Sequence, residues 1–321
     1  TTTITGTGTI INIDGTFTHN NGKVTITSSG GHQTLLPGGA TFNNIDVNTT
    51  SGHDTKLQEN ITIVGTLDLT GSNDYWIVDA AGAAADVTMT MGSSTASGTI
   101  ESNDADRFRL NTHSSGKCII QGVSTLFPCN VTGNDWKWDY AAGAAGTELA
   151  NMNFQVAVDT HTDGSNAVKI TLTGDCEFDA VTVSSGDKID VNGKRMECDD
   201  LVVGGFLDLG SNSLLYCTNL NPNGQVDNEA GANIVIRGDG AGDDVNLNDY
   251  YFVGDDTTNI MIDNGAISTD WAGSYNYAGN MIIGSGIFRS QNSTQNVCHD
   301  LRIVSGAELD GDNDTLTVEG D

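Results

Sequence analysis

The feature that most constrains the fold is a four-residue phrase that returns at a nearly fixed interval. In this phrase a bulky apolar residue or cysteine precedes two polar residues and an aliphatic residue. It begins at positions 42, 178, 198, 217 and 298, and the copies at 178, 198 and 217 follow one another at almost equal steps. A step of this length is one supersecondary unit, which buries its apolar face only by stacking on its neighbours. The phrase therefore predicts a solenoid.

The segments between the phrases alternate apolar and polar residues over three to five positions, as at 24–27, 61–64 and 168–172. This period of two is typical of short strands with one buried face. Glycine (40 residues), Asn and Asp separate the segments, and no helical period is long enough for a crossover helix. A sandwich or barrel remains the alternative, but neither requires one phrase at a fixed interval. We predict an all-β parallel β-helix (a β-solenoid) with rungs of about 20 residues and irregular insertions.

Two further phrases recur. VGTLDLTGSN at 64–73 parallels VGGFLDLGSN at 203–212, and alanine-rich runs at 76–85 and 138–146 resemble each other. Because glycine interrupts each alanine run, we expect small-residue corners or tight packing sites there rather than helices.

Stacked rungs place like residues above like residues, about 4.8 Å apart. We therefore expect the recurring phrase to form an inward structural ladder. Its members are Phe42, Ile45, Phe178, Val181, Cys198, Leu201, Cys217, Leu220, Cys298 and Leu301. The six cysteines form no C-x-x-C pair and no zinc-site spacing with histidine. We expect buried free thiols, with Cys198 above Cys217 in adjacent rungs; a disulfide framework is the alternative.

The charge excludes two classes of partner. Lys and Arg number 13 against 42 Asp and Glu, a net charge of −29. A polyanion with no basic cluster repels nucleic acid and anionic membranes. No apolar run is long enough for membrane insertion. The expected partners are other structural proteins, copies of the same chain or surface glycans.

Candidate catalytic and metal-binding groups are weak. The carboxylate pairs Asp199/Asp200, Asp243/Asp244 and Asp255/Asp256 are unremarkable in a chain with 42 acidic residues, so we predict that the protein is not an enzyme. Asp310, Asp312 and Asp314 place oxygen ligands at alternate positions, like the start of a calcium loop. Thr315 and Asp321 stand where an EF-hand needs Gly and Glu. A looser calcium site or a solvated turn remains, and no other cofactor is expected.

Aromatic residues concentrate where the repeat fades. They are Trp136, Trp138, Tyr140, Tyr250, Tyr251 and Trp271. Aromatic faces stack on sugar rings and anchor protein interfaces, so these residues are candidates for glycan or partner contact. The alternative is that they widen the core at irregular rungs.

The repeats divide the chain into β-helix rungs at 1–74, irregular rungs with the aromatic cluster at 75–160, regular rungs at 161–222, irregular rungs at 223–290 and terminal rungs at 291–321, all within one continuous solenoid. The runs at 15–27, 33–36, 40–47 and 61–69 resemble the repetitive β-helix segments of bacteriophage structural proteins and bacterial surface adhesins. This resemblance implies a right-handed helix, an extracellular location on a virion or cell surface, and a fibre, tailspike or adhesin role.

We therefore expect a non-catalytic structural and adhesive fibre component that mediates assembly and surface contact. The alternatives are a glycan-binding or glycan-cleaving tailspike and a self-polymerising extracellular filament subunit. Both ends of the sequence carry strand-forming residues without a capping helix, so we also expect end-to-end stacking or homo-oligomers.

Overall fold

The computed structural model describes residues 1–28, 30–50, 52–104, 107–141, 146–160, 167–238, 252–253, 256–272, 275–276, 279–291, 296–310 and 316–318. The chain is an all-β parallel solenoid of about 11 turns of about 22 residues, which confirms the predicted fold class. It divides into two compact units, Thr1–Glu177 (unit 1) and Phe178–Asp321 (unit 2). Over the described ranges no helix has the length and apolar character that a membrane crossing requires.

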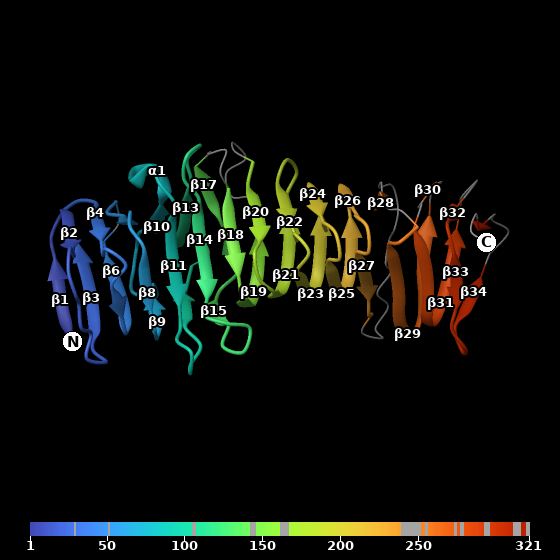
Figure 1. The fold of residues 1–321 in the computed structure, drawn as a ribbon, viewed down its shortest axis with the longest axis horizontal. Coiled ribbons are helices and arrows are strands. Elements are labelled where there is room, and N and C mark those ends of the chain that lie inside the picture. Colours follow the sequence, from blue (N-terminus) through green and yellow to red (C-terminus); the bar gives the residue numbers. More distant parts are fainter. Residues whose placement is uncertain are drawn as a thin grey trace. The chain divides into compact units, whose positions relative to one another are not determined.

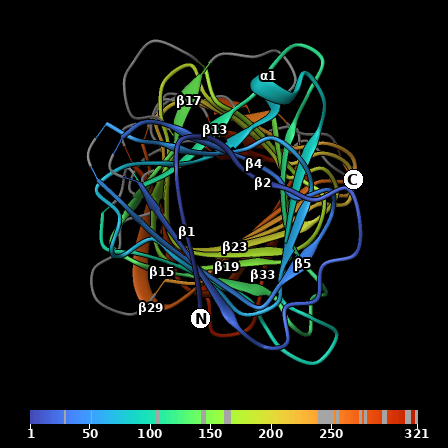
Figure 2. The ribbon, with the colours of Figure 1, turned by 90° about the vertical axis from the view of Figure 1, so that its left-hand side faces the viewer.

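Between residues 23 and 150 each coil of unit 1 passes through three parallel sheets in turn (Figures 1 and 2). Face 1 contains β2 (Gly8–Asn12), β4 (Gln33–Leu36), β7 (Thr55–Leu57), β10 (Trp76–Asp79), β13 (Phe108–Asn111) and β17 (Asp139–Ala141). Face 2 contains β5 (Thr41–Phe42), β8 (Ile61–Ile63), β11 (Val87–Met91), β14 (Cys118–Gly122), β18 (Thr147–Ala150) and β20 (Lys169–Leu172). Face 3 contains β1 (Thr2–Thr5), β3 (Lys23–Ser28), β6 (Asn44–Thr49), β9 (Thr66–Asp68), β12 (Thr99–Ser102), β15 (Cys129–Gly133) and β19 (Met152–Asp159), with β16 (Trp136–Lys137) also beside β19. In Figure 2, β4, β5 and β15 lie on different sides of the coil.

The core of unit 1 follows from the period-two pattern. In β3 and β6, Val24 and Ile26 pair with Ile45 and Val47, and all four side chains are buried. The residues between them face outward, as strand geometry requires. Burying one such aliphatic side chain contributes roughly 1.5–3 kcal/mol. Stacking therefore turns an apolar pattern too short to stabilise one coil into a continuous core.

The coil length in unit 1 is not uniform. Along face 3, Ile45 pairs with Leu67, and Leu67 pairs with Ile100 in the next coil. Ile100 pairs in turn with Val131, and Val131 with Phe154. The two middle steps in sequence, from 67 to 100 and from 100 to 131, are much longer than the first and the last. The extra residues lie in the connections between faces, because the strands themselves stay in register.

Unit 2 has longer strands. Its main sheet contains β21 (Cys176–Val183, within which the unit begins), β23 (Arg195–Val203), β25 (Leu214–Pro222), β27 (Asn233–Ile236), β29 (Asn259–Ala272), β31 (Asn280–Gln291) and β33 (Leu301–Ile303), with β34 (Glu308–Asp310) also beside β31. A second sheet contains β22 (Lys188–Asp190), β24 (Phe206–Asp208), β26 (Gln225–Asp227) and β28 (Phe252–Val253). A third contains β30 (Tyr275–Asn276), β32 (Asn296–Cys298) and β35 (Leu316–Val318).

The recurring phrase encodes a corner. In β23, Cys198 and Leu201 are buried while Asp199 and Asp200 between them are exposed, so the alternation of buried and exposed residues is interrupted inside the phrase although the strand stays in one sheet. Cys198 pairs with Cys217 and Leu201 with Leu220, as the spacing of the two copies predicts. The copy at Phe42 and Ile45 instead divides between β5 and β6. The phrase thus marks corners of different kinds.

All but one of the predicted ladder residues lie in the core. Buried members are Phe42, Ile45, Phe178, Val181, Cys198, Leu201, Cys217, Leu220 and Cys298. Leu301 is only half-buried, which corrects its assignment as a core residue. It lines an open groove of about 370 Å³ with Met281, its partner in β31. Here Cys298 belongs to β32 and Leu301 to β33, so the phrase spans two sheets rather than one bent strand.

The second recurring phrase also marks a corner, and its glycines are required by close approach. A Cβ on Gly65 would lie 2.2 Å from Asn44 Oδ1, and a Cβ on Gly205 would lie 2.4 Å from the carbonyl oxygens of Asp187 and Ser184. The phrase connects β8 to β9 in unit 1 and β23 to β24 in unit 2. Only glycine lets the successive coils approach this closely.

The first alanine run contains a short helix, which corrects the expectation of a helix-free corner. Helix α1 (Ala80–Ala83) connects β10 to β11. Asp79 caps it by accepting a hydrogen bond from Gly82 N (2.9 Å), and Ala84 ends it in the left-handed conformation. A good cap outweighs the cost of one glycine over a single turn. Residues 142–145 of the second run lie outside the described residues.

Candidate functional site: projecting hairpins and a polar corner

Two hairpins project where unit 1 turns from face 2 to face 3. They comprise residues 92–98, between β11 and β12, and residues 123–128, between β14 and β15. Each is closed by an antiparallel bridge, Ser93 with Ala96 and Ser124 with Phe127. The strands on both sides are in register, so the hairpins are aligned and lie in adjacent coils. At the same corner a single residue, Asn151, connects β18 to β19.

The second hairpin presents apolar side chains to solvent. Leu126 is 82% exposed and Val123 is 40% exposed. The other large apolar side chains exposed in the described part of the chain are Ile303 and Val318, both in unit 2. Residues 91–99 and 122–130 contain no charged side chain, although the whole chain carries −29. We name the two hairpins together the neutral ridge.

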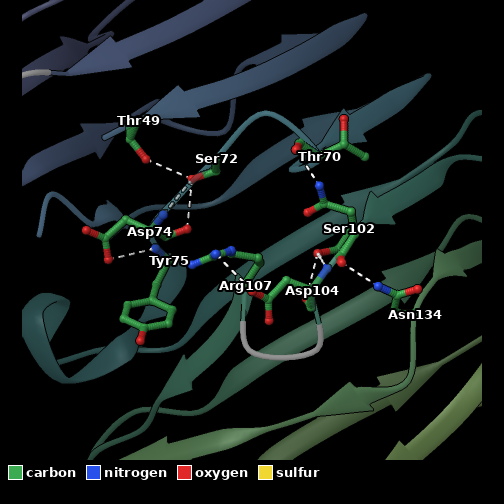
Figure 3. A network of polar contacts seen from close by, with 10 residues as sticks. Thr49, Thr70, Ser72, Asp74, Tyr75, Ser102, Asp104, Arg107 and Asn134 are labelled. Carbon is green, nitrogen blue, oxygen red and sulfur yellow. Dashed lines mark hydrogen bonds and ion pairs between the residues drawn. The ribbon is translucent and has the colours of Figure 1, made fainter. Parts of the chain in front are cut away.

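A polar network fills the corner between face 3 and face 1 of unit 1 (Figure 3). Thr49 Oγ1 lies 2.8 Å from Ser72 Oγ, and Ser72 Oγ donates to the carbonyl oxygen of Asp74 at 2.8 Å. The Asp74 side chain accepts hydrogen bonds from the amides of Tyr75 (3.1 Å) and His53. Asp74 is only 4% exposed, so these amide donors replace the water that its carboxylate gives up.

The network continues into the next coils. Asn103 Nδ2 donates to the carbonyl of Thr70 at 2.9 Å, and Asn134 Nδ2 donates to the carbonyl of Asn103. Asp104 pairs with Arg107 at 2.9 Å (Figure 3). These side-chain amides bind the corner of one coil to the backbone of the coil before it and so satisfy carbonyl groups outside the sheet ladders.

A second carboxyl group lies at the same corner. The amide of Asp54 donates to His32 Nδ1 at 3.1 Å, and Asp54 Oδ2 lies 3.2 Å from the same nitrogen. Burial raises the pKa of Asp54, and the hydrogen bond and charge of Asp74 raise it further. Beside them the guanidinium of Arg109 lies 3.1 Å from the centre of the Tyr75 ring.

Unit 2 carries a ladder of carboxylates on its second sheet. Asp190 pairs with Asp208, and Asp208 with Asp227, in consecutive coils. Lys188 Nζ lies 2.7 Å from Asp208 Oδ2. Burial raises the pKa of Asp190 and of Asp227, with the charge of Asp208 as the next cause. Among the residues with described positions, no group of three or more His, Cys, Asp or Glu side chains could hold a metal ion.

The predicted aromatic contacts are located as follows. Trp136 and Trp138 are 1% and 2% exposed and pack against Phe108 and Phe154, with ring centres 5.3 and 5.7 Å apart respectively. A surface role does not fit their burial, and both rings widen the core. The backbones of Tyr140 and Trp271 lie in β17 and β29, paired with Leu110 and Ser290. Tyr250 and Tyr251 lie outside the described residues.

The structure describes only part of the other predicted sites. Asp310 is half-buried in β34, whereas Asp312 and Asp314 lie outside the described residues, as do Asp243, Asp244 and Asp255. Asp199 and Asp200 are exposed, and Asp200 accepts a hydrogen bond from Asn219 Nδ2 at 2.7 Å. The side chains of this pair therefore contribute to the solvated outer face of the corner.

All six cysteines are buried free thiols. Burial raises the pKa of the Cys118, Cys176 and Cys217 thiols to about 12. A thiol that stays protonated at neutral pH is a poor nucleophile and a poor metal ligand. The cysteines therefore act as small apolar core residues.

Comparison of the chain with protein-family models, with curated proteins and with solved structures finds no match.

Reasoning from the sequence missed the neutral ridge and the polar corner. The run VSTLFP at 123–128 has an apolar pair flanked by Ser, Thr and Pro and lies between two alternating segments. Both hairpins follow a face 2 strand and a glycine, at 92 and at 122, which could have indicated their alignment. The Asp54–Asp74 corner gave no signal, because its residues have no shared motif.

Proposed function

We propose that the chain is a non-catalytic structural and adhesive component of a phage virion or a cell surface. In this proposal it acts outside the cell, assembles with other structural proteins or with copies of itself, and contacts its partner through the neutral ridge. The observation that carries the proposal is the hairpin at 123–128, where Leu126 is 82% exposed at a corner that a later coil turns through Asn151 alone.

Energetics support a contact role for this hairpin. An extended connection costs ordering entropy, and an exposed leucine gains nothing from the fold that displays it. Burying Leu126 against a partner would contribute roughly 1.5–3 kcal/mol. The ridge is also free of the charge that opposes close approach elsewhere on an acidic chain. A solenoid that displays such a tip beyond its sheets is suited to assembly and surface contact.

The test compares a tip variant with a matched control. V123S/L126S removes the apolar tip, and I303S/V318S makes the same kind of change at the exposed apolar residues outside the ridge, in unit 2. Sedimentation velocity over a range of concentrations measures self-association of the full chain, and a glycan array measures sugar binding. We expect V123S/L126S to weaken association while I303S/V318S leaves it unchanged. If neither variant weakens self-association, or if both variants still bind sugar, the ridge is rejected as the contact surface.

A further inference from the structure

The outer face of the main sheet of unit 2 carries a row of apolar and aromatic side chains. It crosses β25, β27, β29 and β31, which lie side by side (Figure 1). The row consists of residues that alternate with the core residues, pair in register from coil to coil and are partly exposed: Tyr216, Val235, Met261 and Ile282. We name these four side chains the outer row. Each of the four strands therefore has apolar or aromatic residues on both faces.

The outward positions of face 3 in unit 1 are polar instead. Consecutive coils there place the following residues in register: Thr25, Asp46, Asp68 and Glu101. A strand with one face in water alternates apolar and polar residues, whereas a strand that is covered on both faces is apolar on both. The outer row thus has the pattern of a sheet face that a second layer covers.

Opposite charges end this strip of the sheet. Glu197 continues the outer row in β23, and Arg302 continues it in β33. The neighbouring outward row has the reverse order, with Arg195 in β23 and Asp300 directly before β33. Glu197 also pairs with Arg195 and lies 3.8 Å from Arg237 within the chain. Because a carboxylate accepts several donors, these contacts leave it able to face a further cation.

The neighbouring row is uncharged between its two ends. Asn259 Nδ2 donates to Asn233 Oδ1 at 2.8 Å, and Asn280 Nδ2 donates to Asn259 Oδ1 at 3.3 Å. These hydrogen bonds run from coil to coil along the sheet, so they satisfy much of the hydrogen-bonding capacity of the amides inside the chain. The amides therefore do not oppose an apolar contact beside them.

We propose that the outer row and its charged ends form the contact of a two-fold symmetric dimer, in which a second copy of the chain packs face to face with its coils in reverse order. A two-fold axis along the strand direction, between β27 and β29, places β23 of one copy over β33 of the other. Glu197 then faces Arg302 of the second copy, and Arg195 faces Asp300 of the second copy. The apolar side chains meet between these ends. This contact belongs to unit 2 and does not depend on the proposed role of the neutral ridge.

The arrangement of charges favours a second copy in reverse order. Reversal places a base opposite an acid in both rows while the two outer rows cover each other. If the coils ran in the same order, two outer rows in contact would place Glu197 opposite Glu197 and Arg302 opposite Arg302. Like charges that face each other across an interface oppose association.

The size of the strip predicts a reversible dimer. With adjacent strands about 4.8 Å apart, it extends roughly 24 Å from β23 to β33. Such a strip is smaller than most stable interfaces, so we expect a dissociation constant that is roughly micromolar or weaker. Each copy carries a net charge of −29, and moderate salt is needed to screen the long-range repulsion.

The experiment measures sedimentation equilibrium of the full chain up to roughly half-millimolar concentration, in about 0.15 M salt. Every sample carries V123S/L126S, so that contact through the neutral ridge does not contribute and the two proposals can fail separately. The variants are Glu197→Arg, Arg302→Glu and the two combined. Lys137→Glu is the matched control, since it makes the same charge change as Arg302→Glu at an exposed residue of unit 1.

We expect each single charge reversal to raise the dimer dissociation constant roughly tenfold or more, because like charges then face each other twice in every dimer. The combined variant should restore the starting value, since the exchanged charges again face their opposites. Lys137→Glu should have no effect. A chain that stays monomeric throughout, or a combined variant that associates no better than the single ones, would overturn the proposal.

Methionine methyl resonances test the same contact without any substitution. Met261 belongs to the outer row, whereas Met281 in the next coil is 1% exposed and faces the core. In the unmodified chain we expect the Met261 methyl resonance to shift with protein concentration and the Met281 resonance to stay constant. A Met261 resonance that does not depend on concentration would overturn the proposed dimer.

Discussion

Truncation of Leu201 to alanine tests the stacking of unit 2 at one position. Leu201 is 1% exposed in β23, its partner in β25 is Leu220, and β21 flanks β23 on the other side. The substitution removes three carbon atoms from a site closed by neighbouring coils. At roughly 0.8 kcal/mol per methylene the lost transfer energy is about 2.5 kcal/mol. The remaining cavity raises the expected loss to about 3–5 kcal/mol, because strands fixed by ladders on both sides cannot collapse into it.

Leu126→Ala is the matched control, since it makes the same chemical change at a side chain that is 82% exposed. Urea unfolding followed by circular dichroism gives the midpoint and the slope for each variant. We expect a lower midpoint for Leu201→Ala and a change within about 0.5 kcal/mol for Leu126→Ala. Equal effects of the two substitutions, or an unchanged midpoint for Leu201→Ala, would show that the inward face of β23 is assigned incorrectly.

Three other features of the chain give testable expectations. Cys198 and Cys217 should resist alkylation at pH 8 until the chain is denatured, because both thiols are buried and the pKa of Cys217 is about 12; mass spectrometry that finds either modified in the folded chain would contradict this. Gly65→Ala should destabilise unit 1 by roughly 1–3 kcal/mol, since the new Cβ would lie 2.2 Å from Asn44 Oδ1, whereas Gly15→Ala, with nothing within 4 Å, should be nearly neutral in the same urea assay. Burial and Asp208 raise the pKa of Asp190, so its contribution is present in acid and lost as pH rises; Asp190→Asn should therefore raise the melting temperature at pH 7 but not at pH 3, and equal shifts at both values would refute the repulsive ladder.

The fold could be predicted because the coils of a solenoid repeat a similar pattern of apolar and polar residues. The copies of the phrase at 198–201 and 217–220 each mark a corner. They also set the register of β23 against β25, and the interval between them equals the length of one coil. The pattern was less informative where coils lengthen. The long steps from Leu67 to Ile100 and from Ile100 to Val131 come from connections whose length carries no periodic signal.

The candidate site was harder to predict, because it depends on contacts between coils and on exposure. Trp136 and Trp138 are of a residue type that is typical of contact surfaces, yet both side chains are enclosed by a wider coil. Leu126 is of a residue type that is typical of cores, yet its side chain is exposed to solvent at the hairpin. Asp54 and Asp74 are separated in the sequence by a full coil and meet only when two coils stack. A single sequence with many acidic residues cannot distinguish such a pair from chance.

Cross-linking across neighbouring coils tests the central claim, that successive coils stack in parallel and in register. Glu197 and Tyr216 are partners in β23 and β25, one coil apart in the sequence, with side chains that point outward. Lys188 is closer to Glu197 in the sequence but lies in β22, in another sheet. Cysteines placed at 197 and 216 should be joined efficiently by a thiol-specific reagent that spans about 5 Å, the spacing of adjacent strands, while the native thiols stay buried. Cysteines at 197 and 188 should not be joined. Efficient linking of 188 to 197 without linking of 197 to 216 would contradict the solenoid.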